Sequence, residues 1–168
     1  MSSVIISYHF TAGETAYILK NALESVGYAA WVDPNPEAGA DWWPGVDGAL
    51  REAFAVVAIA TPEWSASPFS AYEWASALTL GLPVIPLVAE GVTLHPRLNA
   101  LGPLPLDAPI DDLLARIDPL AAELGAAHMH VTPGASPAVA TAAAALGTLD
   151  RAAHPAAVET LAADDAAW

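Results

Sequence analysis

One stretch of the chain places a carboxylate among aromatic rings. Residues 64–74 read Trp-Ser-Ala-Ser-Pro-Phe-Ser-Ala-Tyr-Glu-Trp, so Glu73 stands four residues after Phe69 with further rings on both sides. Ser67 is a favoured N-cap and Pro68 suits the first helical position, which predicts a helix with Phe69 and Glu73 on one face. An acidic side chain in such surroundings costs free energy unless it has a function. The chemistry in view is that of a single carboxylate, although a surface glutamate on an amphipathic helix gives the same pattern.

Other kinds of site find little support in the sequence. The 168 residues include no cysteine, which rules out disulfides, thiolate metal sites and a cysteine nucleophile. The G-x-S-x-G turn that many serine hydrolases use is also missing. His128 and His130 have the spacing of two metal ligands on one face of a strand. Because no third ligand lies near them in the sequence, we expect no metal.

The charge of the chain limits its partners and its surroundings. The formal net charge is -14 at pH 7, with only five lysines and arginines. We therefore expect neither nucleic acid nor an anionic membrane surface as a partner. The N-terminus lacks the pattern of a signal peptide, and no apolar run reaches the roughly 18 residues of a membrane helix. These features predict a soluble, cytoplasmic protein.

Strands and helices are predicted to alternate from residue 4 to residue 124. Short apolar runs predict strands over residues 4–8, 28–32, 54–60, 83–88 and 104–106. Apolar residues at helical spacing predict helices over residues 14–26, 43–53, 68–80 and 111–124. Single helices between successive strands imply right-handed crossovers and a flavodoxin-like parallel sheet of about five strands, flanked by helices.

Ligands of such a sheet bind at the carboxyl ends of its strands. Those ends carry polar residues: Ser7, Tyr8 and His9 after the first strand, Asp33 after the second and Thr61 after the third. Glu73 lies one short loop beyond the third strand, so it can reach the same edge. Asp33 is either a ligand at this edge or a cap for the loop that follows it.

The chain divides into two parts of different composition. Residues 1–124 form the αβ domain, and residues 125–168 form an alanine-rich C-terminal extension. Two helices are plausible in the extension, as a small packed appendage for oligomerisation or docking. A loosely attached linker fragment is the alternative.

Several motifs together resemble the Toll/interleukin-1 receptor (TIR) domain, especially its bacterial members. Ile5-Ile6-Ser7-Tyr8 resembles the first-strand motif of that family, and residues 31–42 resemble its second strand with the following loop. Residues 60–73 resemble the end of the third strand and the W-x-x-x-E helix. The resemblance covers residues 4 to about 124 in order and leaves out the C-terminal extension. Phe69 stands where the family usually has tryptophan, and Thr61 where serine is commoner.

The resemblance implies that NAD+ is a substrate cleaved between nicotinamide and ribose, with no bound cofactor. Glu73 takes the place of the catalytic glutamate, whose carboxylate would stabilise the oxocarbenium-like ribosyl centre left by neutral nicotinamide. Phe69 and Trp64 are candidates for stacking on the flat heterocycles. The remaining candidate substrate-binding residues are Ser7, Tyr8, His9, Asp33 and Thr61.

The resemblance also implies self-association through TIR–TIR contacts. The interface would include the loop after the second strand, with Pro36, Gly39, Asp41, Trp42 and Trp43. The implied role is an NAD+ hydrolase or cyclase that acts as an effector or signal producer in bacterial anti-phage immunity, with a separate sensor or effector protein as partner. Two alternatives stay open: a non-catalytic adaptor that recruits other TIR domains, and an enzyme that transfers deoxyribose between nucleobases.

Overall fold

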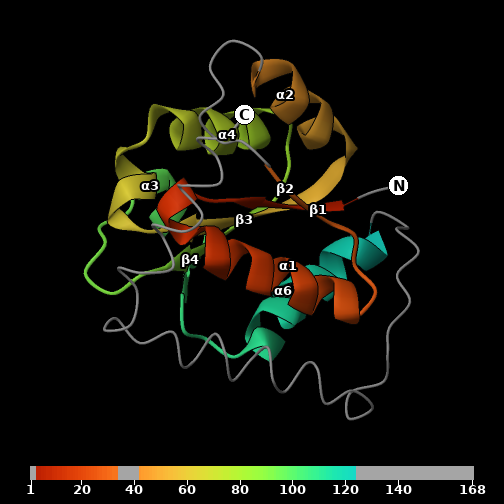
Figure 1. The fold of residues 1–168 in the computed structure, drawn as a ribbon. Coiled ribbons are helices and arrows are strands. Elements are labelled where there is room, and N and C mark those ends of the chain that lie inside the picture. The colour runs from red at the N-terminus through yellow and green to blue at the C-terminus, as the bar shows by residue number, and fades with distance from the viewer. Residues whose placement is uncertain (1–2, 34–41, 124–168) are drawn as a thin grey trace, which may run out of the picture.

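A parallel sheet of five strands forms the centre of the protein (Figure 1). The computed structural model describes residues 3–33 and 42–123. The strands are β1 (Ser3–Ser7), β2 (Ala30–Val32), β3 (Ala53–Ala60), β4 (Val84–Val88) and β5 (Leu104–Pro105). Their order in the sheet is β2-β1-β3-β4-β5, and every neighbouring pair is parallel. This is the predicted flavodoxin-like arrangement.

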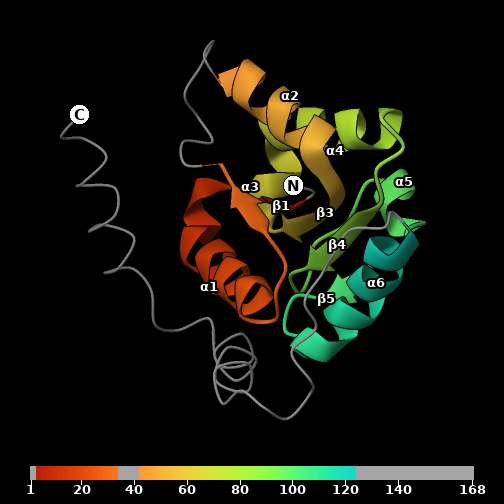
Figure 2. The ribbon, with the colours of Figure 1, turned by 90° about the vertical axis from the view of Figure 1, so that its right-hand side faces the viewer.

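Helices cover both faces of the sheet. They are α1 (Gly13–Ser25), α2 (Trp42–Glu52), α3 (Pro62–Ala66), α4 (Pro68–Thr79), α5 (Pro96–Asn99) and α6 (Ile110–Glu123), with a 3-10 turn, η1 (Phe10–Ala12), before α1. α1 and α6 lie on one face, and α2 and α4 lie on the other (Figures 1 and 2). The buried residues accordingly form two clusters, one on each side of the strands.

The alternation of side chains along β1 decides which face receives its polar end. Val4 and Ile6 belong to the cluster under α1 and α6, whereas Ile5 belongs to the cluster under α2 and α4. Because side chains alternate along a strand, Ser7 lies on the same face as Ile5. The last residue of β1 thus presents its hydroxyl towards the layer that contains α4.

Two short helices occupy segments in which the sequence predicted neither a helix nor a strand. α3 starts at Pro62 with Thr61 as its N-cap, and α5 starts at Pro96 with His95 as its N-cap. In both, a side chain that accepts a hydrogen bond precedes a proline at the first helical position, which starts a helix even over four or five residues. Pro119 lies inside α6, which continues to Glu123, close to the predicted end of this helix.

The uneven pairing of β4 explains the prolines in its sequence. Along one side, Val84 to Val88 all pair with β3, but only Leu87 and Val88 pair with β5 on the other side. Pro86 therefore has no β5 neighbour, which removes much of the cost of its missing backbone donor.

None of the helices in residues 3–33 and 42–123 combines the length and the apolar character that a membrane-spanning helix needs.

Candidate active site

The candidate site lies where the order of the strands reverses. β1 and β3 are adjacent at the middle of the sheet, and their connections leave in opposite directions to β2 and β4. Parallel sheets of this kind bind ligands beyond the carboxyl ends of the strands at this point. Ser7 ends β1 there, and α3 and α4 follow directly from the end of β3.

The start of α4 fixes the position of Glu73. The Ser67 side chain accepts a hydrogen bond from the Ser70 backbone amide, and Pro68 occupies the first turn. Phe69 and Glu73 follow four residues apart, so they lie on one face of α4, as predicted. Glu73 has only 5% of its surface exposed. It is the only acidic or basic residue in α4.

A chain of hydrogen bonds ties Glu73 to two other elements. The Ser7 hydroxyl at the end of β1 donates to Glu73 Oε2. The indole Nε1 of Trp64, from α3, donates to Ser7 Oγ over 2.9 Å. Ser7 and Trp64 are 1% and 2% exposed, so the whole chain runs through the protein interior.

The surroundings of Glu73 favour its uncharged form. The pKa of its carboxyl is raised from 4.5 to about 8 as the net result of three causes: burial, the largest, raises it, the hydrogen bond from Ser7 lowers it, and the negative charge of Asp33 raises it. No cation in the described part of the chain contributes to this balance. A carboxyl with its pKa moved this far, at the carboxyl ends of parallel strands, is typical of a functional site.

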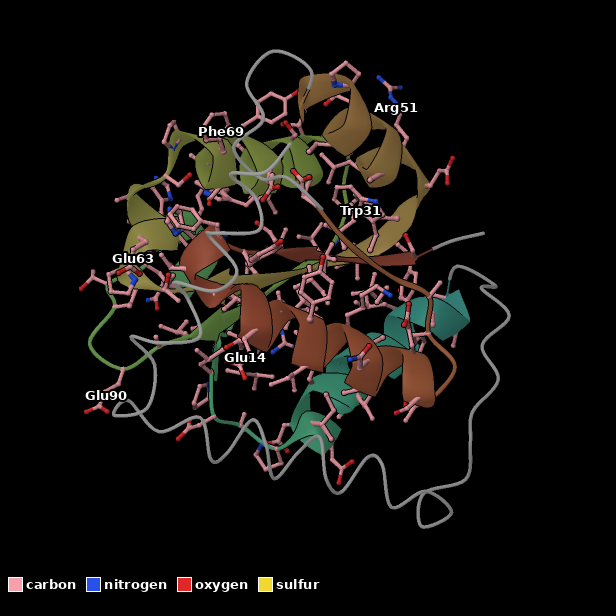
Figure 3. The ribbon with its side chains drawn as sticks, in the orientation of Figure 1. Glu14, Trp31, Arg51, Glu63, Phe69 and Glu90 are labelled. Carbon is pink, nitrogen blue, oxygen red and sulfur yellow. The ribbon has the colours of Figure 1, made fainter. Side chains whose placement is uncertain are left out.

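A narrow depression opens beside Glu73. Its lining residues are Tyr8, His9, Phe10, Ser67, Phe69, Ser70 and Glu73. The depression has a volume of about 10 Å³, which is room for about one water molecule. Phe69 lies on the α4 side of the sheet, while Glu63 and Glu90 point outward to solvent (Figure 3). Glu73 thus differs from these two exposed glutamates at the same end of the sheet.

The fold and the motifs are matched by a known family. A model of the TIR domain family matches residues 4–117. The chain belongs to the TIR domain family. Comparison with curated proteins finds no match.

Two solved structures show what this TIR domain is similar to. The TIR domain of the Toll-related receptor TRR-2 from the lower metazoan Hydra magnipapillata has a TM-score of 0.55 and 16% identity, covering 74% of this chain and 96% of that chain. This likeness shows the fold. The second structure contains the TIR domains of the activated Roq1 resistosome, which directly recognises the pathogen effector XopQ. It has 12% identity and a TM-score of 0.46, and the match covers 98% of this chain and 99% of that chain. That second likeness is too loose to support an argument about this chain.

The structure brings several of the predicted site residues together. Tyr8, His9, Phe69 and Glu73 all line the depression of this TIR domain. Tyr8 also donates a hydrogen bond from its hydroxyl to the Asp33 carbonyl over 2.8 Å, which links the ends of β1 and β2. Asp33 is buried, and its charge acts on Glu73. It was predicted as a ligand or a loop cap, and its position beside Glu73 gives it an electrostatic role at the site.

Three predicted binding residues have other roles in the structure. Trp64 is too deeply buried to stack on a ligand, and its ring lies behind Ser7 in the core under α4. Ser7 is equally inaccessible, with its hydroxyl engaged by Trp64 and Glu73. The Thr61 side chain accepts from the Trp64 backbone amide over 3.2 Å as the N-cap of α3. The Ser7 and Trp64 side chains are therefore not accessible to a substrate in this structure, whereas a contact between the half-buried Thr61 and substrate stays a prediction.

Sequence reasoning missed Phe10, the most exposed aromatic residue at the depression. Phe10 is 48% exposed, and its ring lies 4.4 Å from that of His9, centroid to centroid. It opens η1, for which His9 is the N-cap. Its position could have indicated a role at the site, because Phe10 directly follows His9, a predicted binding residue after the first strand.

Some predicted residues cannot be placed. Pro36, Gly39 and Asp41 of the expected interface loop lie outside the described residues, as do His128, His130 and the whole C-terminal extension. Trp42 and Trp43 begin α2, with side chains outside the described set. In residues 3–33 and 42–123, no group of three or more histidine, aspartate and glutamate side chains could hold a metal ion.

Proposed function

We propose that this TIR domain is an NAD+ nucleosidase of the bacterial type, with Glu73 as its catalytic carboxylate. The observation that carries the proposal is a buried glutamate that opens onto a depression at the switch point of a parallel sheet, with Phe69 beside it. The proposed role is an effector or signal producer in bacterial anti-phage immunity, acting in the cytoplasm. A separate sensor or effector protein would trigger it or respond to its product.

The proposed reaction needs one carboxylate and no general acid. The bond between C1′ of ribose and the ring nitrogen breaks, and its electron pair neutralises the positive nicotinamide ring. The ribosyl centre that remains resembles an oxocarbenium ion, which a nearby carboxylate stabilises. Water then adds to C1′ and loses a proton to solvent, giving ADP-ribose. If a group of the same molecule adds in place of water, the product is a cyclic isomer.

The narrowness of the depression points to activation by self-association. A space for about one water cannot hold a nicotinamide ring, so a substrate has to displace side chains at the opening. Phe10 is half exposed there and belongs to neither buried cluster, so in the proposal its ring is the one that moves. In the proposal, association of TIR domains through the loop after β2 and the start of α2, at Trp42 and Trp43, widens the site. Activity then depends steeply on protein concentration.

The test is release of nicotinamide from NAD+ over a series of protein concentrations. Wild type should release nicotinamide at high concentration, and Glu73→Gln should not. Glu63→Gln is the matched control because it removes a charge from an exposed residue of α3 at the same end of the sheet. No release by concentrated wild type, or equal release by Glu73→Gln, contradicts the proposal. Chromatography of the products separates ADP-ribose from a cyclic isomer.

A non-catalytic adaptor is the second candidate, and the same narrow depression favours it. An adaptor would associate with concentration and release no nicotinamide, which sedimentation and the NAD+ assay distinguish. Supplying a deoxynucleoside with a free base tests the deoxyribosyl-transfer alternative, whose product would be a new deoxynucleoside.

A further inference from the structure

The hydrogen-bond chain from Trp64 to Glu73 has a fixed direction. An indole N–H can only donate, so Ser7 Oγ must accept from Trp64. The serine hydroxyl carries one proton, and the structure directs it to Glu73 Oε2. This direction holds for the charged carboxylate; a neutral Glu73 can carry its proton on either oxygen, because Ser7 Oγ has a second lone pair that can accept from Oε2.

The other oxygen of Glu73 is the one that meets the depression. Among the described residues, every fully buried side-chain nitrogen or oxygen has a hydrogen-bond partner. The described contacts of Glu73 include one hydrogen bond, through Oε2. Oε1 must then supply part of the small exposed surface of Glu73, and Glu73 is one of the residues that line the depression.

We propose that Ser7 and Trp64 are positioning residues, which hold the Glu73 carboxyl so that Oε1 faces the substrate. The inference rests on the proposed function, because it assigns Oε1 as the oxygen that stabilises the ribosyl centre. Ser7 touches neither the depression nor a substrate, since it is absent from the lining and buried. Trp64 acts on Glu73 only indirectly, through its hydrogen bond to Ser7.

The three residues come from separate elements, so their contacts set the spacing of those elements. Ser7 ends β1, Trp64 lies in α3, and Glu73 lies in the second turn of α4. The bonds join residues 57 and 66 positions apart in the chain. A purely structural role for this chain of bonds predicts lost stability, whereas a positioning role predicts changed ionisation and turnover of Glu73.

The experiment compares Ser7→Ala and Trp64→Phe with wild type in NAD+ turnover across pH. Ser7→Ala removes a hydrogen bond to a charged carboxylate, so kcat should fall about 10- to 100-fold with KM nearly unchanged. The pH at which kcat/KM reaches half its maximum should rise by about one unit or more, because the charged form loses its donor. Trp64→Phe keeps a ring and loses the N–H, and kcat should fall about 3- to 10-fold.

The double variant gives the sharpest result. Because Trp64 acts only through Ser7, the Ser7→Ala, Trp64→Phe protein should be no slower than Ser7→Ala alone. The proposal would be overturned if the fold-loss of kcat in the double variant equalled the product of the losses in the two single variants. Ser7→Thr keeps the hydroxyl and should return the pH midpoint to that of wild type, even if the added methyl group reduces stability.

Matched controls are available elsewhere in the chain. Ser25→Ala removes a half-buried hydroxyl that donates to the Ala22 carbonyl, and Trp74→Phe changes an indole that packs on His95. Neither residue lines the depression. Both controls should leave kcat and the pH midpoint unchanged, and an equal effect in the controls contradicts the positioning role.

A direct titration separates this inference from the proposed function. The pKa of Glu73, followed by NMR of its side-chain carboxyl carbon, should be higher in Ser7→Ala than in wild type. If concentrated wild type never cleaves NAD+, the proposed function and the catalytic part of the inference fail. The titration still decides whether Ser7 donates to Glu73, and an unchanged pKa overturns that part too.

Discussion

Replacing Glu73 with glutamine should stabilise this protein at neutral and alkaline pH. Glutamine has nearly the same shape, and its carbonyl can keep the hydrogen bond from Ser7. What it loses is the charge, which the wild-type protein must bury at high pH. Because the expected gain concerns folding alone, the result is independent of any enzymatic activity.

The pKa of Glu73 sets the sign and the size of the effect. Its carboxyl has a pKa of 4.5 when solvated and about 8 in the folded protein, so between these values the folded state holds a proton that the unfolded state has released. This contribution is fully present below pH 4.5 and is lost as the pH rises through 8. At about 1.4 kcal/mol per pKa unit the loss approaches roughly 5 kcal/mol above pH 8, and is roughly 3 kcal/mol at pH 7.

Urea unfolding of both proteins from pH 5 to pH 9 measures the difference directly. The chain has 19 aspartates and glutamates, and their shared contributions cancel when the variant is compared with wild type at each pH. The advantage in unfolding free energy of Glu73→Gln should grow steadily towards pH 8 and then level off. The exposed Glu63→Gln should give a small difference that does not depend on pH. A Glu73→Gln difference that stays flat with pH would refute a buried, uncharged Glu73.

Other predictions concern turnover. The value of kcat/KM for NAD+ cleavage should rise with pH, reach half its maximum near pH 8 and level off above it, since the carboxylate is the active form and the pKa of Glu73 is about 8. A stopped-time assay of nicotinamide at each pH checks this. Asp33→Asn removes the negative charge that raises the pKa of Glu73, so the same profile should move to lower pH; a move to higher pH would be inconsistent with the geometry. Phe10→Ala should raise KM for NAD+ by about 3- to 10-fold through loss of a ring at the depression. Tyr17→Ala, which removes a ring that is equally exposed at 47% but lies away from the lining, should leave KM unchanged.

The parts of the fold with strong local signals could be predicted from the sequence. The run from Phe54 to Ala60 is apolar throughout because β3 is buried on both faces, and its neighbours β1 and β4 give the same kind of signal. Ser67 and Pro68 predicted the start of α4, and therefore the face that carries Phe69 and Glu73. Each of these signals acts within a few residues of the chain.

What could not be predicted depends on contacts between distant residues. Trp64 was expected at the opening of the site because it stands near Glu73 in the sequence. α3 turns its indole inward instead, towards a serine 57 positions earlier. Thr61 and Ser7 were assigned to substrate because they stand at the carboxyl ends of strands, but one caps α3 and the other contacts Glu73. A hydroxyl in a sequence does not reveal whether the protein itself satisfies its hydrogen bonds.

Among the described residues no cation acts on Glu73, and the proposed substrate would bring one. In the described part of the site, burial, Ser7 and Asp33 set the pKa of Glu73, and at pH 7 a pKa of about 8 leaves only about one-tenth of the carboxyl charged. NAD+ has a positive ring next to the bond that breaks, and a cation close to a buried carboxyl lowers its pKa. Once the substrate has displaced the proton, Oε2 of the charged carboxylate accepts from Ser7, and Oε1 is left to face the depression. Negative charge then forms on the oxygen nearest the depression, where the ribosyl centre becomes positive as nicotinamide departs.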